Sequence, residues 1–314
     1  MKEKILKILL ENKGEFVSGE KLAKESGITR GGVWKAVKAL RDEGYEIEAQ
    51  TRKGYKLSGS SDVISKEEIE KHLKTKFLGK DIITLKSVDS TNNYLKNLEN
   101  KRDGLLVVAD EQTKGRGRLN RGFYSPKGSG IYMSILLIPK FDPAFVSQIT
   151  ALASVAVLRA VKKYTDGDIT IKWVNDLYIN GKKFCGILSE ANFTMEDFWI
   201  NYLIVGIGIN VKTKDFPKDL KDVAGSLNLN ISRCELIAQI LNEFETLYED
   251  IGKKTYLDDY KKYQNILGKE IKVIKGNQEF FARAVGIDDE ARLIIEHGGM
   301  REALSSGEVT IRRV

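Results

Sequence analysis

The chain has 314 residues, of which 42% are hydrophobic and 30% are charged, so it is long enough for two or three domains with apolar cores. The 51 lysines and arginines exceed the 44 acidic residues and give a net charge of +7, which permits a nucleic-acid or nucleotide partner without requiring one. Its two cysteines (Cys185, Cys234) and two histidines (His72, His297) lack metal-site spacing, which argues against a zinc protein or a histidine-based triad.

No apolar run is long enough to cross a bilayer, and the first residues, Met1 to Lys7, lack the apolar segment of a signal peptide. The low cysteine content is typical of a reducing compartment. We therefore expect a cytoplasmic protein with no membrane partner.

The N-terminal segment predicts three helices and a hairpin. The first helix covers residues 2–12, the second begins after the N-cap Ser18 and ends at Gly27, and the third has an apolar face made by Val33, Val37 and Leu40. Residues 45–57 predict a hairpin with a basic tip. A helix-turn-helix followed by a hairpin indicates a winged-helix domain.

Residues 1–59 hold 13 Lys and Arg against 9 Asp and Glu, a charge of +4 (13 − 9). We predict that the third helix and the hairpin bind DNA, because a recognition helix reads the major groove while basic residues contact phosphates. A winged helix used for protein contacts, or a basic surface without a partner, is the alternative. Polar residues 59–62 end the domain, which we place at 1–62. The candidate DNA contacts are Thr29, Arg30, Trp34, Lys35, Lys38, Arg52 and Lys53.

Helices and strands then alternate as in an α/β domain, which we place at 63–266. Capping boxes at Ser65 and Ser232 open helices that extend to about Lys76 and Tyr248. The other predicted elements are strands 82–88, 105–109, 131–138 and 198–207 and helices 143–164 and 254–263.

A loop rich in glycine and arginine, residues 111–122, lies between two of these strands. Glycine permits sharp turns and close approach to backbone amides, and arginine grips phosphates and carboxylates. The loop is predicted to bind an anion and close over it, although a solvated basic loop is an equal alternative from this stretch alone. Its spacing is not that of a P-loop, and it does not open a predicted helix as a Rossmann turn does.

Residues 169–188 predict a strand followed by a hairpin, since Asn180-Gly181 lies between two β-rich runs. Alternation along the strands then brings Lys183 close to residues 172–176. Lysine, asparagine and aspartate in a buried strand are unfavourable unless they pair. An ordinary salt-bridged hairpin is the alternative to a functional site.

Three other stretches carry weaker signals. Residues 89–93, Asp-Ser-Thr-Asn-Asn, are more simply interpreted as a helix cap, with hydrogen bonding to an uncharged ligand as the alternative. Gly206 and Gly208 on one strand indicate a bulge or a close approach to the backbone. Residues 212–225 predict a mobile loop.

The last part of the chain predicts a small β domain at residues 267–314. Short apolar runs alternate with turns that contain Gly, Asn or Asp, which indicates an SH3-like barrel. The chain is thus predicted to be a multidomain α+β protein. The predicted C-terminal strands are 271–274, 280–285, 291–295 and 309–311.

The four motifs of the central domain resemble those of biotin–protein ligases, specifically the bifunctional kind that also represses the biotin operon. Each motif alone is weak to moderate, but their order and spacing are specific and the likeness covers nearly the whole chain. One departure is Val174, where the family commonly has proline. The resemblance implies a class II synthetase-like catalytic domain. The motifs are Asp89-Ser90-Thr91-Asn92, Gln112 with Gly115-Arg116-Gly117-Arg118, Lys172-Trp173-Val174-Asn175-Asp176-Leu177-Tyr178 with Lys183, and Gly206-Ile207-Gly208-Ile209-Asn210.

The resemblance also implies residue roles. Catalysis is assigned to Lys183, Arg118 and Asp176, and Asp176 is also the candidate contact for Mg²⁺ carried by ATP. ATP or the adenylate is assigned to Arg118, Arg121, Lys172, Asn175 and Asn210. Biotin is assigned to Ser90, Thr91, Asn92, Gln112, Arg116, Gly117, Arg118 and Lys183.

By the same resemblance, the protein joins biotin to ATP as biotinyl-5′-AMP and transfers biotin to a lysine of a biotin carboxyl carrier protein, an acetyl-CoA carboxylase subunit. The adenylate is then the corepressor of a homodimer on operator DNA, with residues 186–192 as a candidate dimer edge. Joining two anions needs cations at close range and no enzyme nucleophile, which fits the motifs. The alternatives are a ligand-sensing transcription factor without turnover and a lipoate-ligase-like enzyme; the Gly-Arg-Gly-Arg loop and the winged helix favour biotin.

Overall fold

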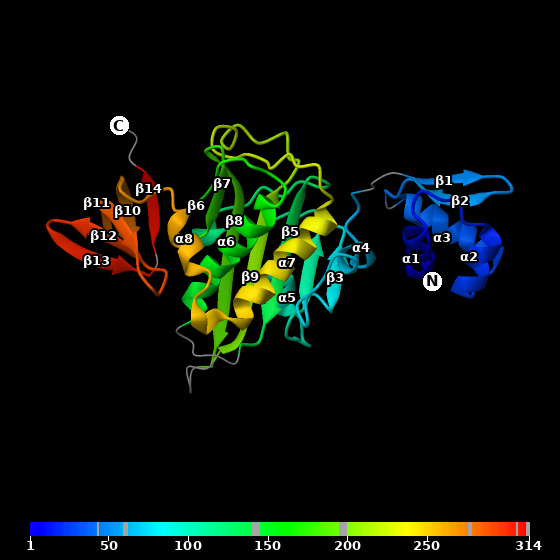
Figure 1. Cartoon of the computed structure of the whole chain (residues 1–314), viewed down its shortest axis with the longest axis horizontal. Coiled ribbons are helices and arrows are strands. Elements are labelled where there is room, and N and C mark those ends of the chain that lie inside the picture. Colours follow the sequence, from blue (N-terminus) through cyan, green and yellow to red (C-terminus); the bar gives the residue numbers. More distant parts are fainter. Residues whose placement is uncertain are drawn as a thin grey trace.

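The computed structural model describes residues 1–42, 44–58, 62–139, 145–194, 200–275, 278–305 and 307–311. These residues form a helical head, a central domain built on a seven-stranded sheet, and a small C-terminal β domain. The head and the β domain lie at opposite ends of the central domain (Figure 1). The predicted multidomain α+β architecture is confirmed.

The head folds as a winged helix, as predicted. The Ser18 hydroxyl accepts a hydrogen bond from the Lys21 amide at 3.1 Å, and Gly27 ends the second helix in the left-handed conformation. Apolar residues from all three helices and from both strands form a core separate from that of the central domain. Its elements are α1 (Lys2–Glu11), α2 (Gly19–Ser26), α3 (Arg30–Asp42), β1 (Ile47–Gln50) and β2 (Gly54–Leu57).

The central sheet has the strand order β3-β4-β5-β9-β8-β7-β6, and only β3 and β4 among these neighbours run parallel. Its strands are β3 (Ile82–Leu85), β4 (Leu106–Ala109), β5 (Gly130–Leu137), β6 (Ile169–Lys172), β7 (Asp176–Ile179), β8 (Lys182–Phe193) and β9 (Ile200–Asn210).

Helices cover both faces of this sheet. Along β4, Val107 packs with Leu95 of α5, whereas Leu106 and Val108 join the larger core beneath α6, α7 and α8. Burial on both faces explains why β4 and β5 are continuous apolar runs in the sequence. The helices are α5 (Thr91–Asn97), α6 (Val146–Lys162), α7 (Arg233–Glu249) and α8 (Leu257–Lys262).

Helix α4 (Lys66–Glu70) is shorter than predicted, although Ser65 caps it through the Glu68 amide at 3.3 Å. The chain leaves the helix because three later backbone amides bind elsewhere. The amides of Lys76, Phe77 and Leu78 all donate to the carboxylate of Glu245 on α7. A long-range contact with α7 thus holds the chain where the predicted helix would have ended.

Residues 169–179 were predicted to lie in one strand, and this prediction is wrong. They form two antiparallel strands, β6 and β7. Lys172 pairs directly with Asp176, so the chain reverses at residues 173–175. Trp173 is buried, and its indole N–H donates to the Ala291 carbonyl of the C-terminal domain at 3.2 Å. The anchored indole explains the turn inside an apolar run.

The C-terminal domain is a five-stranded antiparallel sheet of order β13-β12-β11-β10-β14. Strand β13 was not predicted, because four of its five residues are exposed and apolar and polar residues do not alternate along it. The strands are β10 (Glu270–Lys275), β11 (Gln278–Ile287), β12 (Leu293–His297), β13 (Met300–Leu304) and β14 (Glu308–Ile311).

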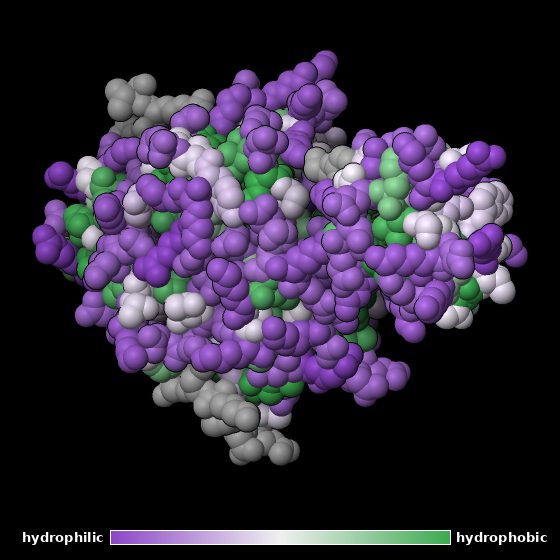
Figure 2. All heavy atoms as spheres, turned by 45° about the vertical axis from the view of Figure 1, so that its right-hand side comes forward, coloured by the Kyte–Doolittle hydropathy of each residue, from purple (hydrophilic) through white to green (hydrophobic). Residues whose placement is uncertain are grey.

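Other predicted bounds shift by a few residues at strand and helix ends. Residues 143–144 of one predicted helix, 198–199 of one predicted strand and 59–61 of the predicted link lie outside the described residues. None of the helices built from described residues has the length and apolar content of a membrane span. Figure 2 shows a face dominated by hydrophilic residues, with hydrophobic ones in small scattered patches.

We predict that Glu245→Ala lowers the free energy of unfolding by about 2–4 kcal/mol, because three backbone amides lose their acceptor. Glu249→Ala, one turn further along the same helix, removes only an exposed ion pair with Lys76 and is expected to cost less than about 1 kcal/mol. Denaturant unfolding of both variants measures the difference. Equal losses for the two variants would refute this role of Glu245.

Candidate functional site

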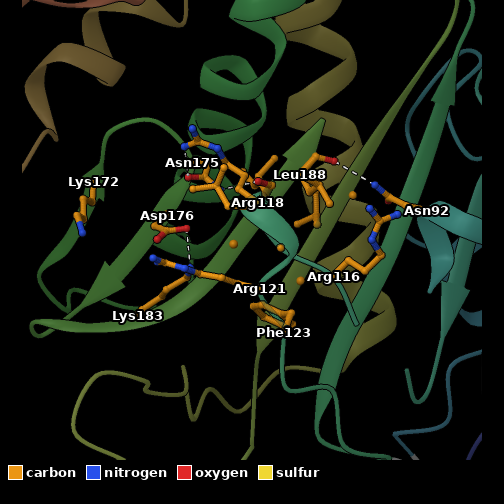
Figure 3. A pocket seen from close by; sticks show the side chains of 18 of the residues that line it. Asn92, Arg116, Arg118, Arg121, Phe123, Lys172, Asn175, Asp176, Lys183 and Leu188 are labelled. Atoms are coloured by element: carbon orange, nitrogen blue, oxygen red, sulfur yellow. Dashed lines mark hydrogen bonds and ion pairs between the residues drawn. The ribbon is translucent and has the colours of Figure 1, made fainter. Parts of the chain in front are cut away.

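A cavity of about 380 Å³ lies between the central sheet and the Gly/Arg loop. Its walls come from strands β5, β8 and β9, the start of α5, the β6–β7 turn, and residues 112–123 of the loop. Residues 220–223 and two residues of β14 complete it. Figure 3 shows Asn92 and Arg116 at one end of this pocket and Lys172, Asp176 and Lys183 at the other.

The first end holds uncharged polar side chains together with Arg116. The amide of Thr91 donates to Gln112 Oε1 at 2.9 Å, and Gln112 Nε2 donates to the Ser125 hydroxyl at 3.1 Å. The buried Ser134 hydroxyl lies 2.7 Å from Thr91 Oγ1 and 2.6 Å from Asn92 Oδ1. These contacts hold Thr91 and Asn92, both buried, in fixed orientations at the cavity wall.

Ser90 occupies the N-cap position of α5, but its side chain makes no capping hydrogen bond. The simpler interpretation of residues 89–93, as a helix cap and nothing more, is therefore wrong for Ser90. Ser90 instead lines the cavity.

Glu190 of β8 organises the same end, although no sequence pattern predicted a role for it. Its carboxylate accepts from Asn92 Nδ2 at 2.7 Å and Lys96 Nζ at 2.6 Å, and lies 3.7 Å from Arg116 Nη1. Burial raises the pKa of Glu190, but the hydrogen bonds from Lys96 and Asn92 and the charges of Lys96 and Arg116 together hold that pKa below its ordinary value. The ionised carboxylate thus fixes the amide of Asn92 and the fork of Arg116.

The opposite end is charged. Asn180 and Gly181 form the predicted hairpin turn, with φ of 49° and 78°. The hairpin register brings Lys183 Nζ within 2.7 Å of Asp176 Oδ1, as predicted, with about a third of the lysine side chain exposed. Lys183 lines the cavity, so its ammonium group is within reach of an anion that enters.

Arg118 fastens the Gly/Arg loop over the cavity. Its guanidinium donates to Asn175 Oδ1 at 3.3 Å and to the Gly307 carbonyl of the C-terminal domain at 2.6 Å. Within the loop, the Gly117 amide donates to the Arg121 carbonyl at 2.7 Å. The loop is therefore joined to the hairpin on one side and to the C-terminal domain on the other.

Gly206 and Gly208 give two neighbours room to reach the sheet. A Cβ on Gly206 would lie 2.3 Å from Asn92 Oδ1, and one on Gly208 would lie 2.6 Å from the Phe123 ring. The close approach that the Gly-x-Gly pattern predicted is confirmed. Phe123 was not predicted as a site residue, because aromatic residues in loops carry no specific signal.

The residues predicted for biotin, ATP and catalysis lie around this one cavity, with one exception. Asn210 is buried at the end of β9 and does not line it, and its Oδ1 has no hydrogen-bond partner among the described residues. Its contact with a ligand stays a prediction. The predicted residues that line the cavity are Ser90, Thr91, Asn92, Gln112, Arg116, Gly117, Arg118, Arg121, Lys172, Asn175, Asp176 and Lys183.

Cations dominate the cavity. Among the described residues that line it there are five lysines and arginines and one carboxylate, Asp176. Like charges gathered in a partly enclosed site repel one another until an anion enters, so the cavity favours ligands with carboxylate or phosphate groups. Apolar residues that sequence reasoning missed complete the walls, namely Phe123, Met133, Leu188, Leu220, Val223 and Val309.

A second basic surface lies on the head. Trp34 projects from α3 with 56% exposure, and Lys38 Nζ lies 5.6 Å from its ring. Arg30 pairs with Glu20 at 3.1 Å, and the Thr29 hydroxyl accepts from the Gly32 amide at 3.2 Å. The predicted contacts on α3 are all exposed, namely Arg30, Trp34, Lys35 and Lys38. At the other candidate element, the β1–β2 turn, Lys53 lies over the Phe16 ring.

Comparisons with known proteins match the division into a head, a central domain and a C-terminal domain. The model of the biotin/lipoate A/B protein ligase family matches residues 84–210, that of an HTH domain matches residues 2–56, and that of the biotin protein ligase C-terminal domain matches residues 266–312.

Two curated relatives extend the likeness to nearly the whole chain, and one solved structure covers three quarters of it. The bifunctional ligase/repressor BirA of Bacillus spizizenii is 38% identical over 94% of both chains, and that of Escherichia coli is 28% identical over 97% of this chain and 95% of the relative. The biotin protein ligase of Aquifex aeolicus, solved with biotin and ATP, covers 75% of this chain and 100% of its own, with 32% identity and a TM-score of 0.65.

We predict that Gly206→Ala lowers the free energy of unfolding by about 1–3 kcal/mol, because the new methyl group overlaps Asn92 in a packed site. Gly252→Ala is the matched control, since a Cβ there meets nothing within 4 Å. Thermal unfolding of the two variants checks this. A Gly206→Ala protein as stable as Gly252→Ala would show that Asn92 is not held against the strand.

Proposed function

This chain belongs to the biotin–protein ligase family, and we propose that its cavity joins biotin to ATP as biotinyl-5′-AMP and then delivers biotin to a lysine of a carrier protein. The observation that carries the proposal is the division of one cavity into two ends. One end holds mainly uncharged polar groups, and its Arg116 faces the Glu190 carboxylate at 3.7 Å, whereas the other end holds Lys172 and Lys183. Biotin matches these two ends, because it has an uncharged ring system at one end and a carboxylate at the other. The chain is also a DNA-binding repressor of the bifunctional ligase/repressor type.

The cavity's contacts suggest how the substrates lie. Thr91, Asn92, Ser90 and Gln112 surround the ring end of biotin, and Lys183 meets its carboxylate. Arg116 and Gly117 enclose the biotin chain from the loop. The triphosphate then lies against the cationic end, with Arg118, Arg121, Lys172, Asn175 and Asn210 as proposed contacts.

The reaction needs positioning and charge more than a protein nucleophile. A biotin carboxylate oxygen attacks the α-phosphorus, a bond to that oxygen forms, and pyrophosphate leaves with its bonding electrons. The ε-amine of the carrier lysine then attacks the acyl carbon, AMP leaves, and the amine gives up a proton. Lys183 and Arg118 stabilise the charge that develops on the phosphoryl oxygens.

Mg²⁺ is proposed as an ion that arrives with ATP. No group of three His, Cys, Asp or Glu side chains suited to a metal occurs in the described part of the chain. Asp176 supplies a single carboxylate, which fits Mg²⁺ because this ion commonly binds one or two carboxylates and substrate phosphates. When bound, the ion neutralises phosphate charge, and Asp176 is also placed to steer the carrier amine.

The repressor form is proposed to be a homodimer with biotinyl-5′-AMP as corepressor. The reason is that operators bound by helix-turn-helix proteins usually contain two half-sites, one for each protomer. Strand β7 lies between β6 and β8, and within β8 it pairs with residues 182–186. Ile187 is hydrogen bonded to Asn175 through its backbone amide at 3.0 Å, but beyond it the described residues of β8, to Phe193, have β9 as their one strand partner, and Phe193 is 46% exposed. This free edge is a suitable dimer surface. Both cysteines are buried and free, which fits the proposed cytoplasmic setting.

We predict that Lys183→Met slows adenylate formation by about 10²–10³-fold, the effect of removing one fixed charge-stabilising donor. Lys182→Met is the matched control, because this exposed neighbour does not line the cavity. Pyrophosphate release with biotin and ATP measures both variants. Near-native release by Lys183→Met would exclude the proposed role.

We also predict that DNA binding weakens steeply with salt. Replacing Lys35 and Lys38 with Gln should reduce the slope of log affinity against log salt by about one per lysine. Lys253→Gln, an exposed residue of the central domain, should leave the slope unchanged. Anisotropy of the full chain with labelled duplex DNA provides the slopes. Binding that ignores salt would contradict a phosphate-binding surface on the head.

A further inference from the structure

Arg233, at the start of α7, is a buried arginine that the reaction does not use. Only 4% of its side chain is exposed. Its guanidinium is nevertheless surrounded by acceptors from three distant segments of the chain. A buried cation with this many partners has its position fixed by them, and it fixes theirs in return.

One side of the guanidinium binds the two points where the segment that contains the Gly/Arg loop leaves β4 and enters β5. Nη1 of Arg233 donates to Asp110 Oδ1 at 2.7 Å and to the Gly130 carbonyl at 3.0 Å. Asp110 directly follows β4 and opens the loop segment, and Gly130 begins β5, which follows it. The arginine therefore closes the base of the loop that covers the cavity.

The other side of the guanidinium holds the root of the head. Nε of Arg233 lies 3.2 Å from Asp62 Oδ2, and the Arg233 amide donates to Asp62 Oδ1 at 2.8 Å. The next residue, Val63, packs against the core of the head, and its carbonyl accepts from Cys234 Sγ at 3.4 Å. Nearby, Tyr45 of the head and Ser65 are both buried. We call residues 44–46 and 62–65 the joint.

We propose that Arg233 is a positioning residue that couples closure of the Gly/Arg loop over the adenylate to the placement of the DNA-binding head. The guanidinium is planar and rigid, so a shift of Asp110 when the loop closes moves the group that holds Asp62. If Arg233 lost either carboxylate, a charge would remain without its partner in a largely buried site. Arg233, Asp62 and Asp110 therefore move together.

The proposal rests on the proposed function and supplies a physical route for its corepressor step. Coupling between two sites requires an element whose arrangement both sites influence. Asp110 belongs to the cavity side of this element, and Asp62 belongs to the head side. Arg233 alone touches both of them among the described residues, with Lys212 as a second, exposed partner of Asp62 at 3.3 Å.

Hydrogen exchange of the full chain, with and without biotin, ATP and Mg²⁺, tests the coupling. In the native protein, exchange should slow both in the loop, residues 111–122, and in the joint. In Asp62→Asn, the loop should still respond, while the response of the joint should fall by at least about fivefold, the lower end of typical coupling between sites. Lys212→Met is the matched control and should retain both responses.

Asp110→Asn cuts the same link from the loop side and should give the same loss in the joint, so the test does not depend on one variant. Thermal unfolding of each variant separates loss of coupling from loss of the fold. A joint that responds normally in both aspartate variants, or a native joint that ignores ligand while the loop responds, would overturn the proposal. Failure of the proposed function gives a different result, namely no response in the loop and no pyrophosphate.

Discussion

The gathering of five cationic side chains around one cavity is the constraint on which the rest of the structure depends. Charges of one sign stay close only when the fold holds them there, and three separate devices do so. The tight turn at Asn180 and Gly181 places Lys183 beside Asp176, the Gly/Arg loop carries three arginines, and the C-terminal domain accepts a hydrogen bond from Arg118. The cavity is thereby prepared for ligands that bring negative charge, and its preorganisation lowers the reorganisation needed during the reaction.

The end of the cavity at the start of α5 is lined mainly by uncharged polar side chains. A chain of hydrogen bonds through Thr91, Asn92, Ser134 and Glu190 leaves little freedom for the groups that face an uncharged ligand. Specificity then arises because a ligand that cannot satisfy these groups leaves them unpaired. Because a winged helix lies on the same chain, occupancy of this cavity can change the affinity of the protein for DNA. Linkage requires that any gain in DNA binding caused by the adenylate is matched by tighter adenylate binding on DNA.

Local patterns predicted local structure well. Ser18, Gly27, Ser65 and Ser232 cap helices as expected, and the Asn-Gly turn defines the register that pairs Lys183 with Asp176. Contacts between distant segments were beyond such reasoning. Glu245 shortens α4 and Trp173 divides a predicted strand in two, both through partners more than 100 residues away. Ser134 and Glu190 were missed for the same reason, because a single polar residue in a buried strand does not reveal which loop it faces.

The central claim is that this cavity activates biotin with ATP, and one assay tests it most directly. Purified protein is incubated with ATP and Mg²⁺, together with either biotin or lipoate, and pyrophosphate is followed over time. The account predicts release with biotin and only background release with lipoate. Absence of pyrophosphate with biotin would contradict it and would leave a DNA-binding protein with a ligand still to be found, while release with lipoate alone would reassign the cavity to the other acid of this family.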